Sequence, residues 1–355
     1  MEETLAGAPG VTAALTTIAS RRPSGVGTRT RAEKGNAMQK RRLGQTAVEV
    51  TAIGFGAAPL AGMPDTYGYS VDEATARATL HAIFDSPVNL LDTSRNYGFG
   101  RSEARIGAVI RERGGLPAGF VLSTKLDRDM QTGRFDAARA RRSFEESLET
   151  LGLDHIQILH LHDPEHALDL TEVTRRGGAL DALFRIKQEG LATAVGLAMG
   201  RVDIMLPLVK DWPFDVILSH NRYTLLNRSA DPLFDEAAAR GITIFNAAPF
   251  AGGILAKGSA QSGKITYQDA TEETLAPVRQ IEAFCAAHGL APGAAALQFS
   301  LRDPRIASTI VGVSKPERVA QTLDWAAAQI PDWPALVSLP HSRTDPEADR
   351  VYRPG

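Results

Sequence analysis

The sequence lacks the features that mark secreted, membrane-spanning or nucleic-acid-binding proteins. It contains a single cysteine, Cys285, so no disulfide can form within the chain, as is typical of a cytosolic protein. No apolar run reaches the roughly 20 residues that a membrane-spanning helix needs. Because 39 basic side chains nearly balance 41 acidic ones, no excess charge would attract nucleic acid or an anionic membrane. We therefore expect a cytoplasmic protein that acts on a small molecule, with Cys285 in its core.

Length and composition set the expected domain organisation. The chain has 355 residues, of which 43% are hydrophobic, enough for one large α/β domain with extensions. Residues 1–40 are rich in Ala, Thr, Gly, Ser and Arg without a sustained period. We expect them to be disordered, or to be a mis-annotated extension before a true start at Met38. The folded domain is expected over residues 41–340, followed by a tail over 341–355.

Short apolar segments alternate with amphipathic ones along this domain. The predicted strands are 52–56, 89–93, 120–125, 156–162, 193–198, 216–221, 242–247 and 308–313. The predicted helices are 72–85, 102–113, 136–151, 178–189, 202–210, 232–240, 271–287, 293–301 and 316–328. A short hairpin is predicted over Arg41–Val50, around Gly44. Apolar strands that alternate with helices are typical of a parallel sheet, and eight such units predict an α/β protein closed into a single-domain (β/α)8 TIM barrel.

Polar side chains occur where three of the predicted strands end. Asp92 ends the second strand, Lys125 the third and His162 the fourth, and Tyr97 lies in the loop after Asp92. Because active sites in such barrels lie at the carboxyl ends of the strands, we expect one site that contains all four. A nearby ammonium lowers the pKa of a tyrosine from about 10, a carboxylate holds the ammonium, and a neutral histidine orients a substrate oxygen. This set predicts a general acid and base suited to hydride transfer with a nicotinamide.

Other interpretations stay open at the level of sequence. Taken singly, Asp92 is a turn residue, Lys125 a solvated side chain and His162 a structural histidine. His160 and His162 lie two residues apart on one strand, so with His220 they allow a metal-dependent hydrolase. The remaining strand ends lack further ligands, so we expect no metal. A third interpretation is a nucleotide-binding regulatory subunit without catalysis.

Four motifs carry a resemblance to a known family. They are Leu91-Asp92-Thr93-Ser94 with Tyr97-Gly98, Ser102-Glu103, Ser123-Thr124-Lys125 and Leu161-His162-Asp163. In this order and spacing the chain resembles the aldo-keto reductase superfamily over about residues 41–330, and it is most similar to the sugar and pyridoxal dehydrogenases within it. The resemblance implies a hydride-transfer barrel in which Tyr97 donates or accepts the proton. Lys125 and Asp92 would tune Tyr97, and His162 would orient the substrate.

The resemblance also implies a cofactor site. Its expected residues are Gly56, Ala57, His220, Phe250, Gly253, Ser314, Lys315 and Arg318. The family binds the adenine end after the eighth strand, where backbone amides at a helix start bind phosphate. We expect NAD, because the Lys-Ser pair of NADP-preferring members is not intact at Ser314-Lys315, although NADP stays an alternative. A different interpretation of Ser314 and Lys315 is that they cap the last helix. Three usual nicotinamide contacts differ here: Ala198-Met199 replaces a Ser-Asn pair, His220 a Gln and Ala247 an aromatic residue.

The expected substrate is a cyclic hemiacetal. Removal of a hydride from the hemiacetal carbon, while Tyr97 takes the hydroxyl proton, gives a lactone. The same reaction applies to aldoses such as L-fucose, D-arabinose or L-galactose, and equally to pyridoxal. The expected pocket residues are Tyr67, Tyr69, Phe99, Asp163 and Phe250, with Asp163 able to accept a hydrogen bond from a sugar hydroxyl or to cap a loop. The alternative of the same class is a general NADPH-dependent aldehyde or ketone reductase.

Overall fold

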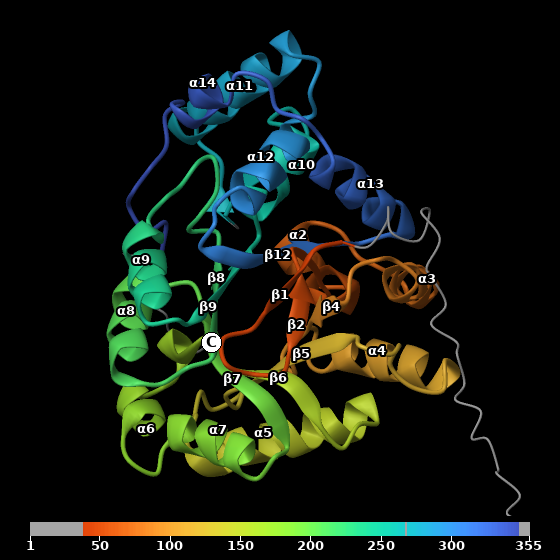
Figure 1. Ribbon diagram of the computed structural model, residues 1–355, viewed down its shortest axis with the longest axis vertical. Coiled ribbons are helices and arrows are strands. Elements are labelled where there is room, and N and C mark those ends of the chain that lie inside the picture. The colour runs from red at the N-terminus through yellow and green to blue at the C-terminus, as the bar shows by residue number, and fades with distance from the viewer. Residues whose placement is uncertain (1–37, 267, 348–355) are drawn as a thin grey trace, which may run out of the picture. The chain divides into compact units, whose positions relative to one another are not determined.

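Eight parallel strands form a closed barrel in the computed structural model, which describes residues 38–266 and 268–347. In barrel order they are β12 (Ile306–Gly312), β3 (Ile53–Gly56), β4 (Leu90–Asp92), β5 (Val121–Leu126), β6 (Ile156–His162), β7 (Ala192–Met199), β8 (Val216–His220) and β9 (Thr243–Ala247). Every neighbouring pair is parallel, so the carboxyl ends of all the strands meet at one end of the barrel (Figure 1). The predicted (β/α)8 barrel is confirmed, and each strand lies within two residues of its expected bounds.

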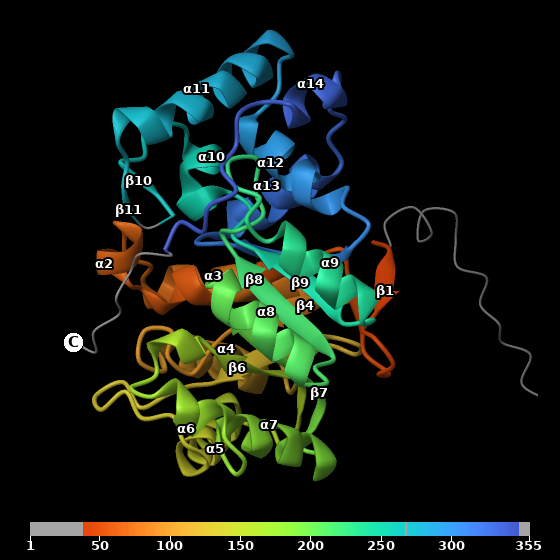
Figure 2. The ribbon, with the colours of Figure 1, turned by 90° about the vertical axis from the view of Figure 1, so that its left-hand side faces the viewer.

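The long helices follow the strands as predicted. They are α3 (Glu73–Phe84), α4 (Arg101–Glu112), α5 (Ala137–Leu151), α7 (Ala179–Gln188), α8 (Val202–Asp211), α9 (Asp231–Ala239), α11 (Glu272–Ala287), α12 (Pro292–Leu301) and α13 (Pro316–Ala326). Aspartate caps explain two of the starts: Asp72 accepts from the backbone N–H of Thr75, and Asp136 from that of Arg139. Figure 2 shows α12 between the barrel and α11, the outermost of these helices on that side.

Short elements that the sequence analysis did not predict lie in the loops. They are η1 (Ala58–Ala61), α2 (Pro64–Tyr67), η2 (Pro164–His166), α6 (Leu170–Thr174), η3 (Ala251–Gly253), α10 (Ile254–Lys257), the hairpin of β10 (Lys264–Ile265) and β11 (Gln268–Asp269), and α14 (Trp333–Val337). Each is shorter than two helical turns or a typical strand, so hydrophobic periodicity could not reveal it.

The N-terminal hairpin packs on the amino end of the barrel. β1 (Lys40–Arg42) and β2 (Glu49–Thr51) pair antiparallel, and the turn between them contains Gly44 at φ 51°. The hairpin's apolar side chains share a buried cluster with inward-facing residues of the strands: Leu43, Val48 and Val50 pack with Leu90, Val121, Ile158 and Ala194. The predicted hairpin is therefore confirmed, and it leaves the carboxyl end of the barrel open for a site.

The two ends of the chain are described only in part. The expected disorder of residues 1–40 falls almost wholly on residues 1–37, outside the described part of the chain. Of the expected tail, residues 341–347 pack on the barrel, where the fully buried Arg222 donates from Nη2 to Asp345 Oδ1 at 2.9 Å. Cys285 is buried, as predicted. Within residues 38–266 and 268–347, no helix has both the length and the apolar character needed to cross a membrane.

Candidate active site

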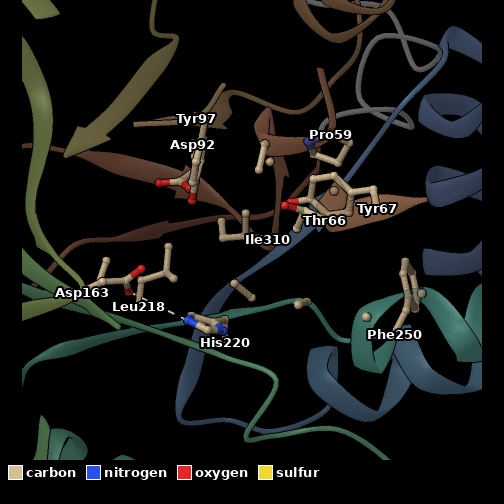
Figure 3. Close-up of a pocket in the computed structure, with 18 of the residues that line it drawn as sticks. Pro59, Thr66, Tyr67, Asp92, Tyr97, Asp163, Leu218, His220, Phe250 and Ile310 are labelled. Atoms are coloured by element: carbon tan, nitrogen blue, oxygen red, sulfur yellow. Dashed lines mark ion pairs between the residues drawn. The ribbon is translucent and has the colours of Figure 1, made fainter. Parts of the chain in front are cut away.

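Asp92, Tyr97, Lys125 and His162 line one cavity of about 300 Å³ at the carboxyl end of the barrel. Asp92 and His162 are the last residues of β4 and β6, and Lys125 is the last but one of β5. Tyr97 comes from the loop between β4 and α4. Figure 3 shows Tyr97 and Asp92 together on one wall of the cavity. The barrel thus brings together four side chains that the sequence separates by up to 70 positions.

Lys125 is held at the centre of this group. Its ammonium donates to Asp92 Oδ2 at 2.7 Å, to the carbonyl oxygen of Thr93 at 2.5 Å and to Tyr97 Oη at 3.2 Å. The side chain is 1% exposed, and Ser123 Oγ donates to the second oxygen of Asp92 at 2.9 Å. All three ammonium hydrogens are therefore used, and the hydroxyl hydrogen of Tyr97 is left to point toward the cavity.

The pKa of Tyr97 is raised, whereas the sequence predicts that Lys125 lowers it. Burial of the phenol raises its pKa well above 10, and the negative charge of Asp92 adds to the increase. Lys125 does not lower the pKa of Tyr97 overall, because the carboxylate of Asp92 offsets the charge of the ammonium at close range. Tyr97 is thus a neutral phenol in the free protein, ready to donate a proton.

His162 faces Tyr97 across the cavity with a defined orientation. Its ring stands edge-on to that of Tyr97, with 5.6 Å between the centroids. Nδ1 lies 2.6 Å from Asp127 Oδ1, and because a carboxylate only accepts, Nδ1 carries the hydrogen. Burial lowers the pKa of His162, but the charges of Asp163 and Asp127 outweigh it and raise the pKa. Nε2 is left to face the cavity.

The sequence analysis missed Asp127 and the supporting role of Ser94. The Ser94 hydroxyl donates to Asp127 Oδ2 at 2.6 Å, and the Asp127 side chain is 1% exposed. A signal existed, because Asp127 follows Lys125 by two residues and so leaves β5 on the same side of the strand. The carboxylate lies just past the last residue of β5, where a loop is the default expectation.

The cavity extends from these residues toward the loops after β9 and β12. Of the expected cofactor-binding residues, Gly56, His220, Phe250 and Gly253 line it. Ala57 does not: it is fully buried, and its backbone N–H donates to the carbonyl oxygen of Asp92 at 2.8 Å. Ala57 therefore supports the backbone behind the cavity and has no surface to offer a cofactor.

Ser314, Lys315 and Arg318 lie where the chain passes from β12 to α13, and none of them lines the cavity. Burial raises the pKa of the cavity-lining Tyr69, while a hydrogen bond with Ser314 and the charge of Arg318 lower it, so both residues lie close to that phenol. Lys315 is the N-cap residue of α13 without a side-chain cap bond. The side chain of Lys315 therefore does not cap α13, contrary to the capping alternative for this residue.

Lys257 is a cavity-lining cation that the sequence analysis did not name. Its ammonium lies 4.7 Å from the centre of the Tyr69 ring. Lys257 is the last residue of α10. This short helix begins directly after Gly252 and Gly253, which have φ of 76° and 102°. A glycine-rich segment followed by a lysine after the seventh barrel strand was the available signal.

The expected substrate residues divide into two groups. Tyr67, Tyr69, Asp163 and Phe250 line the cavity. Phe99 does not: its side chain is 80% exposed, and it lines a separate surface depression with Arg95 and Arg128. Phe99 has φ 57° between two glycines that also have positive φ, and this left-handed backbone turns the ring away from the barrel.

His160 and His162 do not share a site. His160 is fully buried inside the barrel, edge-on to Phe245, and fills the space beside Gly196, where a Cβ would lie 2.7 Å from its Nδ1. Within the described ranges, no three His, Cys, Asp or Glu side chains gather closely enough to hold a metal ion. The geometry therefore gives the metal-dependent hydrolase no support.

Comparison with known proteins agrees with this geometry. The sequence model of the Aldo/keto reductase family matches residues 52–333. Similar relatives include pyridoxal 4-dehydrogenase of Microbacterium luteolum, at 31% identity over 85% of this chain and 97% of the relative. L-galactose dehydrogenase of Arabidopsis thaliana is 32% identical over 81% of this chain and 87% of its own length. D-threo-aldose 1-dehydrogenase of a Pseudomonas species is 32% identical over 79% of this chain and 91% of its own length. The chain therefore belongs to the aldo/keto reductase family and is an oxidoreductase that uses a nicotinamide cofactor.

Proposed function

We propose that this enzyme is an NAD-dependent dehydrogenase that oxidises a cyclic hemiacetal to a lactone. Its substrate is an aldose, such as L-fucose, D-arabinose or L-galactose, or it is pyridoxal. The observation that carries the proposal is the convergence of Tyr97 and His162 on one point of the cavity, with Lys125 behind the tyrosine. The names of the three relatives support this substrate class.

The cavity fits a nicotinamide dinucleotide. Gly56 lines it where a Cβ would come within 3.4 Å of Ile310, so the missing side chain leaves room for a flat ring. Lys257 and Arg318 supply positive charge suited to the diphosphate and adenine ends. An oxidised nicotinamide held there would supply the hydride acceptor for the reaction.

The protein's own groups handle the oxygen of the substrate. Because the raised pKa of His162 favours the ring protonated on both nitrogens, Nε2 donates to the oxygen of the hemiacetal hydroxyl, and the hydroxyl hydrogen points to Oη of Tyr97. When the C–H bond breaks and its electron pair leaves as hydride, the O–H bond also breaks, and the proton passes to the phenolate form of Tyr97. Lys125 stabilises that phenolate through its hydrogen bond at 3.2 Å, and a carbonyl forms at the former hemiacetal carbon.

We favour NAD over NADP on the adenine side. The Lys-Ser pair that NADP-preferring members use is not intact at Ser314-Lys315, and Ser314 lies close to the phenol of Tyr69.

Aromatic faces at Tyr67, Tyr69 and Phe250 suit both a sugar ring and a pyridine ring.

A second candidate is a general aldehyde or ketone reductase that uses NADPH. The raised pKa of Tyr97 favours it, because a neutral phenol is the form that donates a proton to a carbonyl oxygen.

One experiment separates the two candidates. L-Fucose, D-arabinose, L-galactose and pyridoxal are offered singly with NAD and with NADP, and the absorbance of reduced nicotinamide is followed. The dehydrogenase oxidises at least one of them faster with NAD. Oxidation of none, together with consumption of NADPH on simple aldehydes, would establish the reductase instead.

A further inference from the structure

Asp163 lines the cavity, and one of its carboxylate oxygens has no hydrogen-bond partner among the described residues. It is the residue after His162, which lines the same cavity. Its Oδ1 is buried and accepts no hydrogen bond from any residue in the described ranges. Nε2 of His220 lies 4.0 Å from Oδ1, which is beyond hydrogen-bond length (Figure 3).

This carboxylate has no structural task that explains it. Asp163 stands at the start of η2 but makes no side-chain cap bond, so the capping alternative does not apply. Burial raises its pKa, but His162, His220, His166 and Arg128 together lower it, and the group is ionised. A buried carboxylate oxygen without a donor is costly, so a donor from a ligand would relieve a real penalty.

The position of the carboxylate defines where that donor must lie. Asp163 Oδ2 is 3.4 Å from Nε2 of His162, the atom that faces the reacting oxygen. Oxygens on neighbouring carbons of a ring lie about one hydrogen-bond length apart. A second hydroxyl on the carbon next to the reacting carbon therefore falls within reach of Asp163 when His162 holds the first.

We infer that Asp163 selects substrates that carry this second hydroxyl, and the inference rests on the proposed function. In an aldopyranose the group is the 2-hydroxyl. In pyridoxal the phenolic hydroxyl is one ring carbon further from the reacting carbon, so pyridoxal lacks the group. The carboxylate accepts a hydrogen bond from the 2-hydroxyl, whereas pyridoxal and simple aldehydes or ketones offer it no such donor.

The test compares two substrates in two proteins. The wild type and Asp163→Asn are assayed for kcat/KM on L-fucose and on 2-deoxy-L-fucose, or on the corresponding pair for another aldose that the wild type oxidises. Asparagine tolerates the φ of 41° at this position, so the backbone is preserved. The wild type should prefer the hydroxyl-bearing substrate by roughly 10- to 100-fold, as a charged hydrogen bond predicts. Asp163→Asn should lose about that factor on this substrate and change less than about 3-fold on the analogue.

Controls keep the outcomes apart. Asp169→Asn, in the exposed part of the same loop, should behave as the wild type, since asparagine also caps α6. Binding of reduced cofactor, measured by fluorescence, checks that Asp163→Asn is folded. If the wild type oxidises neither the aldoses nor pyridoxal, the proposed function fails. If it oxidises pyridoxal alone, the inference is overturned while the function stands. If it oxidises both members of the aldose pair within about 3-fold, or if Asp163→Asn loses equally on both, the inference is likewise overturned while the function stands.

Discussion

Asp127 accepts a hydrogen bond from Nδ1 of His162, with 2.6 Å between Nδ1 and Oδ1. Its second oxygen accepts from Ser94 Oγ, also at 2.6 Å, so the buried carboxylate is fixed on both sides. This pair determines which nitrogen of His162 faces the cavity. Such supporting groups commonly matter nearly as much as the side chains that they orient.

Asp127→Asn should lower kcat by roughly 10- to 100-fold, because an amide lacks the charge that raises the pKa of His162 and offers Nδ1 both a donor and an acceptor. KM for the cofactor should change little, since Asp127 does not line the cavity. Asp129→Asn is the matched control, because Asp129 accepts from the backbone of Thr132 in the same loop but does not contact His162. Equal activity of Asp127→Asn and Asp129→Asn would contradict the assigned role.

The raised pKa of Tyr97 gives the two directions of the reaction opposite pH dependences. Reduction needs the phenol, which persists through neutral pH, so its kcat/KM should stay level and fall only at alkaline pH. Oxidation needs the phenolate, so its kcat/KM should rise continuously with pH up to at least about pH 10. Initial rates measured in both directions across pH provide the test, and an oxidation profile that is level from neutral pH upward would argue against Tyr97 as the proton acceptor.

Glu103 should destabilise the fold at alkaline pH. The side chain is fully buried on α4, with one oxygen accepting from Thr124 Oγ1, and burial raises its pKa from 4.5 to about 7. The unfolded chain loses this proton near pH 4.5 and the folded chain near pH 7, so stability falls as pH rises between these values and stays reduced above them.

Glu103→Gln should therefore raise the free energy of unfolding by about 1–3 kcal/mol at about pH 8, and by much less near pH 4.5. Urea unfolding at both pH values measures the difference. Glu149→Gln, at an exposed position of α5, is the control and should shift neither value. A pH-independent effect of Glu103→Gln would show that the buried charge is not its cause.

Arg222 should stabilise the fold by holding the C-terminal segment, residues 341–347, against the barrel. Its fully buried guanidinium meets Asp345 at 2.9 Å and Glu347 at 2.6 Å, and it also donates to the carbonyl oxygen of His220. Arg222→Met removes a buried guanidinium that pairs with two largely buried carboxylates, which should cost about 3–5 kcal/mol. Arg343→Met removes an exposed partner of Asp231 and should cost about 0–1 kcal/mol. Thermal and urea unfolding of both variants compare the two ion pairs, and equal stabilities would contradict the role of Arg222.

Much of the fold was accessible from sequence because the barrel repeats one simple pattern. Most strand positions are apolar, and the long helices carry apolar residues at helical spacing, as in α5 with Phe144 and Leu151. Parallel closure then follows, and it brings Asp92, Lys125 and His162 to one end. Features that depend on three-dimensional detail were not accessible. The outward turn of Phe99 is set by a run of positive φ angles, and the pKa of Tyr97 is set by burial and by the balance of Lys125 against carboxylates.

The most direct test of the account is turnover by wild type and Tyr97→Phe with NAD and the preferred hemiacetal substrate, alongside NADH binding by both. The phenol contacts Lys125 and lines the cavity, whereas the ring itself remains in the variant. The account predicts lactone formation by the wild type, a loss of roughly 100- to 10,000-fold in kcat for Tyr97→Phe, and NADH affinity unchanged within about 3-fold. Comparable turnover by the two proteins would contradict it.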